Sequence, residues 1–322
     1  MTMMQNILLI AILSFSRPFL LKHTRPRYIQ LRSSSLADFL ESENTAADLK
    51  EVITALASSS IEIAEHLAYH PFSELVKTKS YNPSGEEQKS LDVLSDLTIQ
   101  NNLRQKATSV RAYISEELSH ILIFPRALMQ DNLIVACDPL DGSSNIDCAV
   151  ATGTIFSVLN STSHDDSGLE KEILSKCDKS MIAAGYVMYS SSTELVITLG
   201  RGKGTHGFTL DRKKNEYFLT KHRMKCPERG AYYSLNEGRA SDWPDGLRRY
   251  ISNIKDGKGE SGKKYSLRYI CSLVADAHRT LLYGGWAANP RKHLRLLFEA
   301  APIAFIFEEA GLNPFSVHLL IW

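Results

Sequence analysis

Asp138 and Asp141 stand three residues apart, with Pro139 between them, directly after an apolar run at 133–137. Such a run predicts a buried strand. A strand that ends in acidic residues places their oxygens at the carboxyl edge of a sheet, where open α/β sheets bind ligands. Clustered carboxylate oxygens are the ligands that Mg²⁺ prefers. The pair therefore indicates a metal site, although one Asp pair of this kind is equally compatible with a turn that only caps a helix.

The next three residues, Gly142, Ser143 and Ser144, favour phosphate binding. They predict a turn or a helix start with accessible backbone N–H groups, and such groups bind anions. Metal ligands followed at once by an anion-binding segment indicate metal-assisted phosphoryl chemistry.

Further acidic residues lie at strand ends or inside apolar runs. Glu116 and Glu117 follow a strand-like run at 110–114, Asp92 stands in an apolar helical run, and Glu299 stands among large apolar residues. Adjacent glutamates are usually part of a solvated loop, but Asp and Glu are seldom buried without a partner. A bound metal would be that partner. Together with the Asp pair, these residues predict a two-metal hydrolase site.

Several longer motifs carry a resemblance to a known family over residues 47–311. They are KSLDVLSD, ISEE, DPLDGSSNIDCAVATGTIFSV, AAGYVMYSS, YSLNEG, LRYICSLVADAHRTLLYGG and HLRLLFEAAP. Together they resemble fructose-1,6-bisphosphatase. DPLDG alone indicates only the wider superfamily of sugar and inositol phosphatases, whereas GSSNIDC and NEG narrow the resemblance to this family.

The resemblance implies an α+β fold with α-β-α-β-α layers and mixed sheets. It also implies a phosphoric monoester hydrolase that acts in gluconeogenesis or the Calvin cycle as a homotetramer. The reaction would be the Mg²⁺-dependent hydrolysis of the 1-phosphate of fructose 1,6-bisphosphate. Two alternatives stay open: a sedoheptulose-1,7-bisphosphatase or dual bisphosphatase (or inositol phosphatase) of the same superfamily, and an inactive truncated isoform.

The resemblance also assigns roles to individual residues. Two or three Mg²⁺ ions, or Mn²⁺, would be held by Glu116, Glu117, Asp138, the Leu140 carbonyl, Asp141 and Glu299. Asp92, with Glu117, would orient and deprotonate the attacking water. The phosphate groups would be bound by Gly142, Ser143, Ser144, Asn236, Arg239, Arg268, Tyr269 and His293, with Arg268 reaching across a subunit interface. A mobile loop at 81–90 would close over the site and contribute Glu86 or Glu87.

Some positions depart from the family pattern. Arg239 stands where the family has Tyr, Asn289 replaces another Tyr, and His293 replaces a Lys. A guanidinium group binds phosphate well, so Arg239 can compensate for the lost lysine.

The first predicted helix carries the AMP inhibitor site in the family. Here Ala46 and Lys50 replace its threonines, and Asn132 and Leu133 replace a Lys-Tyr pair. We therefore expect weak or absent AMP inhibition.

Composition excludes some other functions. The formal net charge of +1 lacks the basic excess of a nucleic-acid binder. The five cysteines form no CxxC pattern, so neither a zinc site nor a disulfide framework is indicated. Redox-regulated members of the family carry several cysteines in an inserted loop, and this chain has only Cys177 there. Thioredoxin control is therefore not expected.

The ends of the chain differ from its middle. Residues 1–46 combine a short apolar run at 6–15 with an Arg- and Ser-rich, acid-poor segment, which predicts a bipartite plastid-targeting leader. A secretory signal and a cytoplasmic location remain the alternatives, and no membrane attachment is expected of the mature form. We expect an N-terminal region at 47–235 with the metal site, a substrate region at 236–311, and an unaligned, truncated tail at 312–322.

Periodicity predicts the remaining elements. Helices are expected at 49–67, 245–254 and 271–283. Residues 160–180 predict a surface loop. The apolar or alternating runs between 181 and 235 predict a second sheet.

Overall fold

The computed structural model describes residues 6–9, 34–69, 80–83, 85, 87–124, 132–161, 169–173, 179–312 and 319–320. Glu86 and Cys177, both named above, lie outside the described residues. No helix in these ranges is long and apolar enough to cross a membrane.

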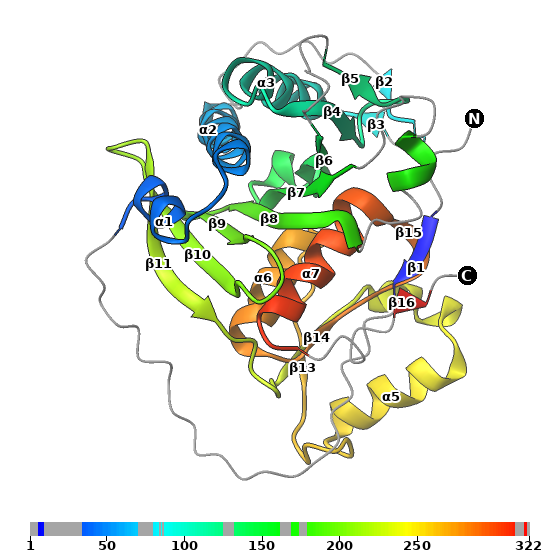
Figure 1. Cartoon of the computed structure of the whole chain (residues 1–322). Coiled ribbons are helices and arrows are strands. Elements are labelled where there is room, and N and C mark those ends of the chain that lie inside the picture. The colour runs from blue at the N-terminus through cyan, green and yellow to red at the C-terminus, as the bar shows by residue number, and fades with distance from the viewer. Residues whose placement is uncertain are drawn as a thin grey trace.

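An eight-stranded mixed sheet forms the centre of the molecule (Figure 1). Its order is β11-β10-β9-β8-β7-β6-β4-β5. Only β4 and β6 pair in parallel, and the other neighbours are antiparallel. The strands are β4 (Val110–Ser115), β5 (Leu122–Ile123), β6 (Leu133–Asp141), β7 (Thr152–Asn160), β8 (Met181–Tyr189), β9 (Thr193–Thr198), β10 (Thr205–Asp211) and β11 (Glu216–Met224).

The prediction of a second sheet after residue 181 was wrong for β8 to β11. These strands continue the sheet that contains β6, because β8 pairs with β7 and each later strand forms an antiparallel hairpin with the one before it. The alternating pattern marks a strand, but it does not say to which sheet the strand is added.

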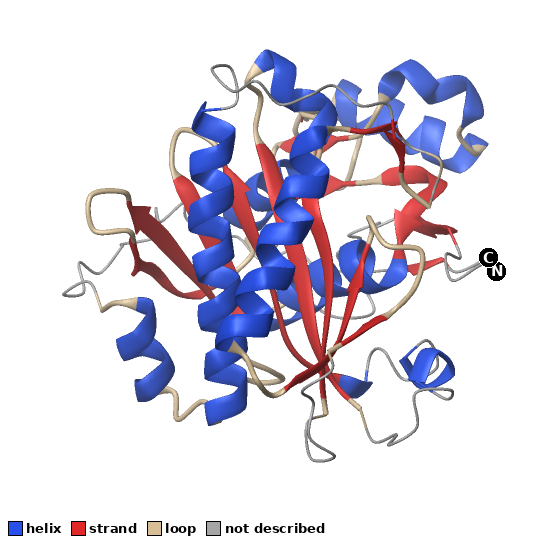
Figure 2. Ribbon diagram, turned by 90° about the horizontal axis from the view of Figure 1, so that it is seen from above, coloured by secondary structure: helices blue, strands red, loops and turns tan. Residues whose placement is uncertain are grey.

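Helices cover both faces of this sheet (Figure 2). Val135 and Cys137 of β6 belong to the core beneath α2 (Ala47–Tyr69) and α3 (Ser90–Lys106). Ile134 and Ala136 belong to the core beneath α6 (Leu273–Tyr283) and α7 (Ala301–Glu309). A strand buried on both faces is a continuous apolar run, which is why this segment is easy to recognise.

A smaller sheet and a helix complete the predicted layers. The sheet has the order β13-β12-β14, formed by β12 (Tyr232–Ser234), β13 (Ser266–Leu267) and β14 (Trp286–Ala287). It shares a core of Tyr233, Trp243 and Trp286 with α5 (Asp245–Asp256). The layers therefore run helix, sheet, helix, sheet, helix, in agreement with the predicted α-β-α-β-α architecture (Figure 1).

Both ends of the chain contribute to a third sheet, of order β15-β1-β16. β1 (Asn6–Leu9) pairs antiparallel with β15 (Asn289–Arg295) and with β16 (Leu319–Leu320). A two-stranded hairpin of β2 (Ser80–Tyr81) and β3 (Glu87–Gln88) lies in the predicted mobile loop.

Helix α1 (Leu36–Ser42) lies inside the range predicted as a leader. Ser35 and Asp38 form a capping box at its start, an arrangement that satisfies two otherwise unpaired N–H donors. The Leu219 amide of β11 donates to the Ser34 carbonyl, at 2.9 Å, and fixes the segment against the sheet.

The predicted helices are present, and α6 begins at Leu273, two residues later than expected. The predicted surface loop at 160–180 contains a helical turn at 169–173, whose Leu169 and Ile173 are buried. That part of the loop prediction was therefore wrong: two apolar residues four apart are enough to bury a single helical turn.

Candidate metal and substrate site

Both aspartates of the DPLD motif face the same cleft because β6 contains a bulge. Side chains three residues apart on a regular strand point to opposite faces. Here Asp138 pairs with Ile155 and Asp141 pairs with Gly153. Between these two pairs, β6 therefore contains one residue more than β7. An extra residue in one strand re-aims the side chains that follow it. The Thr154 hydroxyl donates to the Pro139 carbonyl at 2.8 Å and holds the bulge in place.

Asp138, Asp141 and Glu299 form the centre of the site. A carboxylate oxygen from each lies within 4.8 Å of the others, and all three residues are buried. Burial raises the pKa of Asp138 well above its usual range, and the neighbouring charges of Asp141 and Glu299 raise it further. Burial likewise raises the pKa of Asp141. The site thus concentrates negative charge that a cation would compensate.

Helix α6 holds Asp141 with its N-terminus. The Ser272 hydroxyl donates to Asp141 Oδ2 at 2.7 Å, and the amides of Leu273 and Val274 donate at 3.2 and 2.9 Å. The N–H groups of a first helical turn lack intrahelical partners and favour an anion. Asp141 is therefore fixed in orientation before any ligand binds.

Gly142 allows this close approach. Its φ of 73° lies in the left-handed region, and a Cβ at this position would come 2.9 Å from the Cβ of Ser272. Only glycine fits both requirements. The 3₁₀ helix η2 (Ser143–Cys148) then begins with Ser143 and Ser144 at the edge of the cleft.

Glu299 lies in a π-helical turn, η4 (Leu296–Ala300), directly before α7. Turns of this kind occur often at functional sites. The backbone amide of Arg295 donates to Glu299 Oε2 at 2.5 Å. The guanidinium group of Arg295 also forms an ion pair with Glu299, in which Nε lies 3.0 Å from the same oxygen. The same guanidinium forms an ion pair with Glu116, and all three side chains are buried.

The two glutamates that follow β4 line the same cleft. Glu116 is buried and accepts a hydrogen bond from the Asn82 side-chain amide at 3.1 Å. Glu117 accepts a hydrogen bond from Gln88 of β3. The hairpin in the predicted mobile loop therefore contacts both glutamates, although Glu86 itself lies outside the described residues.

Asp92 enters the cleft from the first turn of α3. It is buried, and its Oδ2 accepts the Lys89 amide at 2.7 Å. The structure thus gathers all of the predicted metal and catalytic positions in one cleft. We call it the metal cleft; it is lined by Asp92, Glu116, Glu117, Asp138, Leu140, Asp141 and Glu299.

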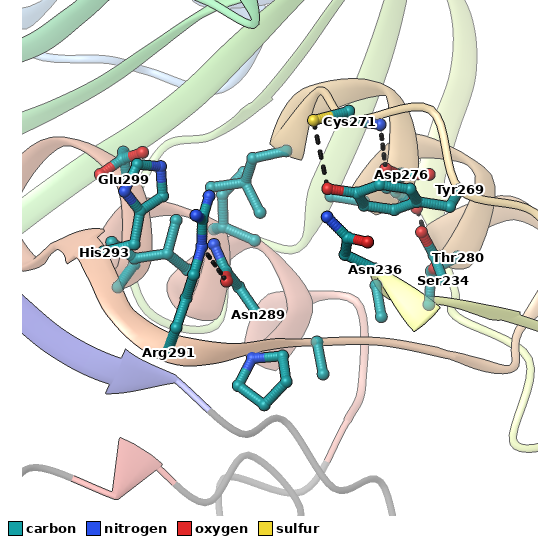
Figure 3. A pocket seen from close by; sticks show the side chains of 18 of the residues that line it. Ser234, Asn236, Tyr269, Cys271, Asp276, Thr280, Asn289, Arg291, His293 and Glu299 are labelled. Atoms are coloured by element: carbon teal, nitrogen blue, oxygen red, sulfur yellow. Dashed lines mark hydrogen bonds between the residues drawn. The ribbon is translucent and has the colours of Figure 1, made fainter. Parts of the chain in front are cut away.

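A second pocket adjoins the metal cleft and shares Asp141 and Glu299 with it (Figure 3). We call it the sugar pocket; its polar lining includes Ser234, Asn236, Arg239, Tyr269, Asn289, Arg291 and His293. Four predicted phosphate-binding residues, Asn236, Arg239, Tyr269 and His293, are therefore brought together. Arg268 does not line the pocket. Its exposed side chain lies over the ring of Tyr232, 5.3 Å from the ring centroid.

Several residues of the site were not predicted. Arg295 stands inside the apolar run LRLLF, and a cation in such a run indicates a buried charged partner. Asp276 accepts the amides of Ile270 and Cys271 at 3.2 Å and so shapes the segment that carries Tyr269. No local sequence pattern identifies that contact.

The comparisons with known proteins agree with this geometry. Residues 32–222 match the family described as "Fructose-1-6-bisphosphatase, N-terminal domain", and residues 226–316 match its C-terminal domain. The fructose-1,6-bisphosphatase class 1 of Sorangium cellulosum is 45% identical over 73% of this chain and 68% of its own length. The chloroplastic enzyme of Brassica napus is 41% identical over 82% of this chain and 68% of its own length.

Solved structures show the same fold. The holo form of fructose-1,6-bisphosphatase from Leishmania major superposes with a TM-score of 0.79 at 33% identity, covering 87% of each chain. This match also confirms the predicted sugar phosphatase fold. The chain therefore belongs to the fructose-1,6-bisphosphatase family and is a phosphatase.

Proposed function

We propose that this chain hydrolyses the 1-phosphate of fructose 1,6-bisphosphate to give fructose 6-phosphate and inorganic phosphate. The observation that supports this most strongly is the buried carboxylate cluster of Asp138, Asp141 and Glu299 beside a polar sugar pocket. A sugar bisphosphate has two anionic ends, and the two adjoining cavities supply one environment for each.

The donor set fits divalent cations, and we propose Mg²⁺, in two or three copies, with Mn²⁺ as the alternative ion. Burial raises the pKa of Asp138, and the neighbouring charges of Asp141 and Glu299 raise it further, as expected where negative charge is not compensated. Oxygen ligands of this kind suit hard cations. Glu116, Glu117 and the Leu140 carbonyl are the further ligands that line the cleft. When bound, such cations neutralise phosphate charge and acidify water.

The protein's own residues would do the remaining work. Asp92 of α3 and Glu117, which follows β4, would orient the attacking water and accept its proton. The amides of residues 142–144 would hold the reacting phosphate at the edge of the cleft. Positioning and electrostatics of this kind account for most of the catalysis of phosphoryl transfer.

The seven-carbon substrate of sedoheptulose-1,7-bisphosphatase is the alternative. It is favoured by the departures at Arg239, Asn289 and His293, all of which line the sugar pocket. An inactive isoform is less consistent with the site, because the acidic residues are all present and converge in one cleft. We further propose that the protein works as a homotetramer in a plastid. Chloroplastic relatives support that location, while a yeast relative also matches.

The decisive experiment measures phosphate release from fructose 1,6-bisphosphate by the full chain, with and without Mg²⁺ and in competition with sedoheptulose 1,7-bisphosphate. Metal-dependent release that the seven-carbon sugar inhibits only weakly supports the proposal. Faster release from the seven-carbon sugar would favour the alternative. No release from either substrate by a folded, Mg²⁺-binding protein would contradict both.

A further inference from the structure

Arg291 of β15 borders both halves of the site. It lines the metal cleft and the sugar pocket, and its side chain is half-buried. In the close-up view it lies between His293 and Glu299 on one side and Asn236 and Tyr269 on the other (Figure 3). The family resemblance assigns no role to this residue.

The charge of Arg291 is not compensated by a carboxylate in the described part of the chain. Its Nε donates to the side-chain oxygen of Asn289 at 3.1 Å, which fixes the orientation of the guanidinium without neutralising it. A neutral hydrogen-bond partner leaves the charge and the other N–H donors for a ligand.

Three other arginines near the site have carboxylate partners, and a fourth, Arg268, is exposed and lies over the ring of Tyr232. Arg295 is bound to Glu116 and Glu299. Arg279 of α6 is bound to Asp276 at 3.1 Å. Arg239 has Asp242 at 3.8 Å, and its side chain is 54% exposed, so solvent screens its charge.

We propose that Arg291 binds the distal phosphate of the substrate, the one that is not cleaved, within a single subunit. This inference rests on the proposed function. A guanidinium group binds a phosphate with two parallel charged hydrogen bonds. In this chain Arg291 therefore supplies in the same subunit the cationic contact that a lysine at position 293 would otherwise make.

The position of Arg291 favours the distal phosphate over the reacting one. Its positive charge acts on the Tyr269 phenol, whose pKa it lowers against the larger effect of burial. Tyr269 and Asn236 belong to the sugar pocket and not to the metal cleft. Arg291 thus faces the side of the site that would hold the phosphate remaining on the product.

The test compares ligands that have and lack the distal phosphate. We would measure fructose 6-phosphate binding by calorimetry with EDTA present, so that no metal contributes. We would also measure turnover of fructose 1,6-bisphosphate and of fructose 1-phosphate. The variants are Arg291→Gln, Arg291→Lys and Asn289→Ala, and the matched control is Arg249→Gln on the exposed face of α5.

Arg291→Gln is expected to weaken fructose 6-phosphate binding about 10- to 100-fold, the usual effect of losing a charged hydrogen bond. The KM for fructose 1,6-bisphosphate should rise by a similar factor, with kcat changed less than about twofold. Arg291→Lys should restore part of the affinity, and Asn289→Ala should have a smaller effect in the same direction. Turnover of fructose 1-phosphate should not change.

An equal loss with fructose 1-phosphate would overturn the proposal, because it would place Arg291 at the reacting end. Unchanged fructose 6-phosphate binding in Arg291→Gln would overturn it as well. Failure of the proposed function would give a different result, because the wild type itself would release no phosphate. Binding of fructose 6-phosphate in EDTA would still test the role of Arg291 in that case.

Discussion

Within the described residues, Asp138 accepts a hydrogen bond from the Leu140 amide at 3.0 Å and otherwise faces like charges. Asn can accept the same hydrogen bond without the charge. Asp138→Asn should therefore raise the free energy of unfolding of the metal-free protein by about 1 kcal/mol, at the lower end of what a buried polar group without full compensation costs. Urea unfolding at pH 8 in EDTA measures this change.

The same variant should lose its response to metal. Mg²⁺ at a hundredfold excess over Kd should stabilise the wild type by about 3 kcal/mol. The same Mg²⁺ concentration should stabilise Asp138→Asn by much less. Phosphate release should become undetectable. Asp256→Asn, at an exposed position on α5, is the control. A variant that is less stable in EDTA but still responds to Mg²⁺ would show that Asp138 has a structural role only.

Cys271 adopts a left-handed backbone conformation, with a φ of 66°. This conformation costs an L-residue other than glycine about 1 kcal/mol or more. Cys271→Gly should therefore be at least as stable as the wild type, with a free energy of unfolding up to about 1 kcal/mol higher. Its urea midpoint should be unchanged or higher. Cys271→Val should lower the midpoint, because β-branched residues tolerate this region least. If both variants lose the same stability, packing of the thiol and not the backbone decides.

At the scale of elements, helix α6 joins the metal site to the sugar pocket. Its N-cap Ser272 accepts the Ala275 amide at 3.3 Å and donates to Asp141. One turn later, Asp276 holds the segment that carries Tyr269. A change at the start of this helix should therefore affect stability and ligand binding together.

Ser272→Ala removes the cap and one of the groups that orient Asp141. It should cost about 1–2 kcal/mol of stability and weaken Mg²⁺ binding about 10- to 100-fold, as is typical when a group that orients a ligand is lost. Ser35→Ala removes the N-cap of α1, far along the chain from the acidic cluster, and is the matched control. It should cost similar stability and leave Mg²⁺ affinity unchanged; similar affinities in both variants would count against the coupling.

The elements that the sequence predicts well are those with a local cause. β6 is a continuous apolar run, α5 follows Trp243 and Pro244 and ends at Gly257, and α6 has a serine cap. The error about the second sheet concerns partners that are distant in sequence. Nothing local says that β8 joins β7 in the same sheet, and only an extra residue relative to β7 creates the bulge at Asp138.

The same limit applies to the site at the scale of the whole molecule. The sequence predicted the acidic residues of the site because each lies in a short continuous motif that resembles the family. The ion pair between Glu116 and Arg295 and the contact of Arg291 with two cavities depend on how β4, η4 and β15 meet in space. Resemblance therefore located the chemistry, and only the assembled layers showed which charges compensate one another.

The packing of the layers also predicts how stability depends on pH. His278 of α6 is buried against the central sheet, where its Nδ1 is hydrogen-bonded to the Tyr186 hydroxyl at 2.9 Å. Burial, aided by the charge of Lys221, lowers the pKa of His278 from 6.5 to about 4. The unfolded chain therefore binds a proton more readily than the folded protein between these values.

Stability from this residue is fully present above pH 6.5 and is lost as the pH falls toward 4. The full shift corresponds to about 3 kcal/mol, of which about 2 kcal/mol should be lost by pH 5. His278→Asn cannot titrate, so the difference in unfolding free energy between wild type and variant should shrink by about 2 kcal/mol between pH 7.5 and pH 5. His120→Asn, at an exposed position, should leave that difference constant. Parallel pH profiles for wild type and His278→Asn would instead mean that other buried groups dominate the acid response of this interface.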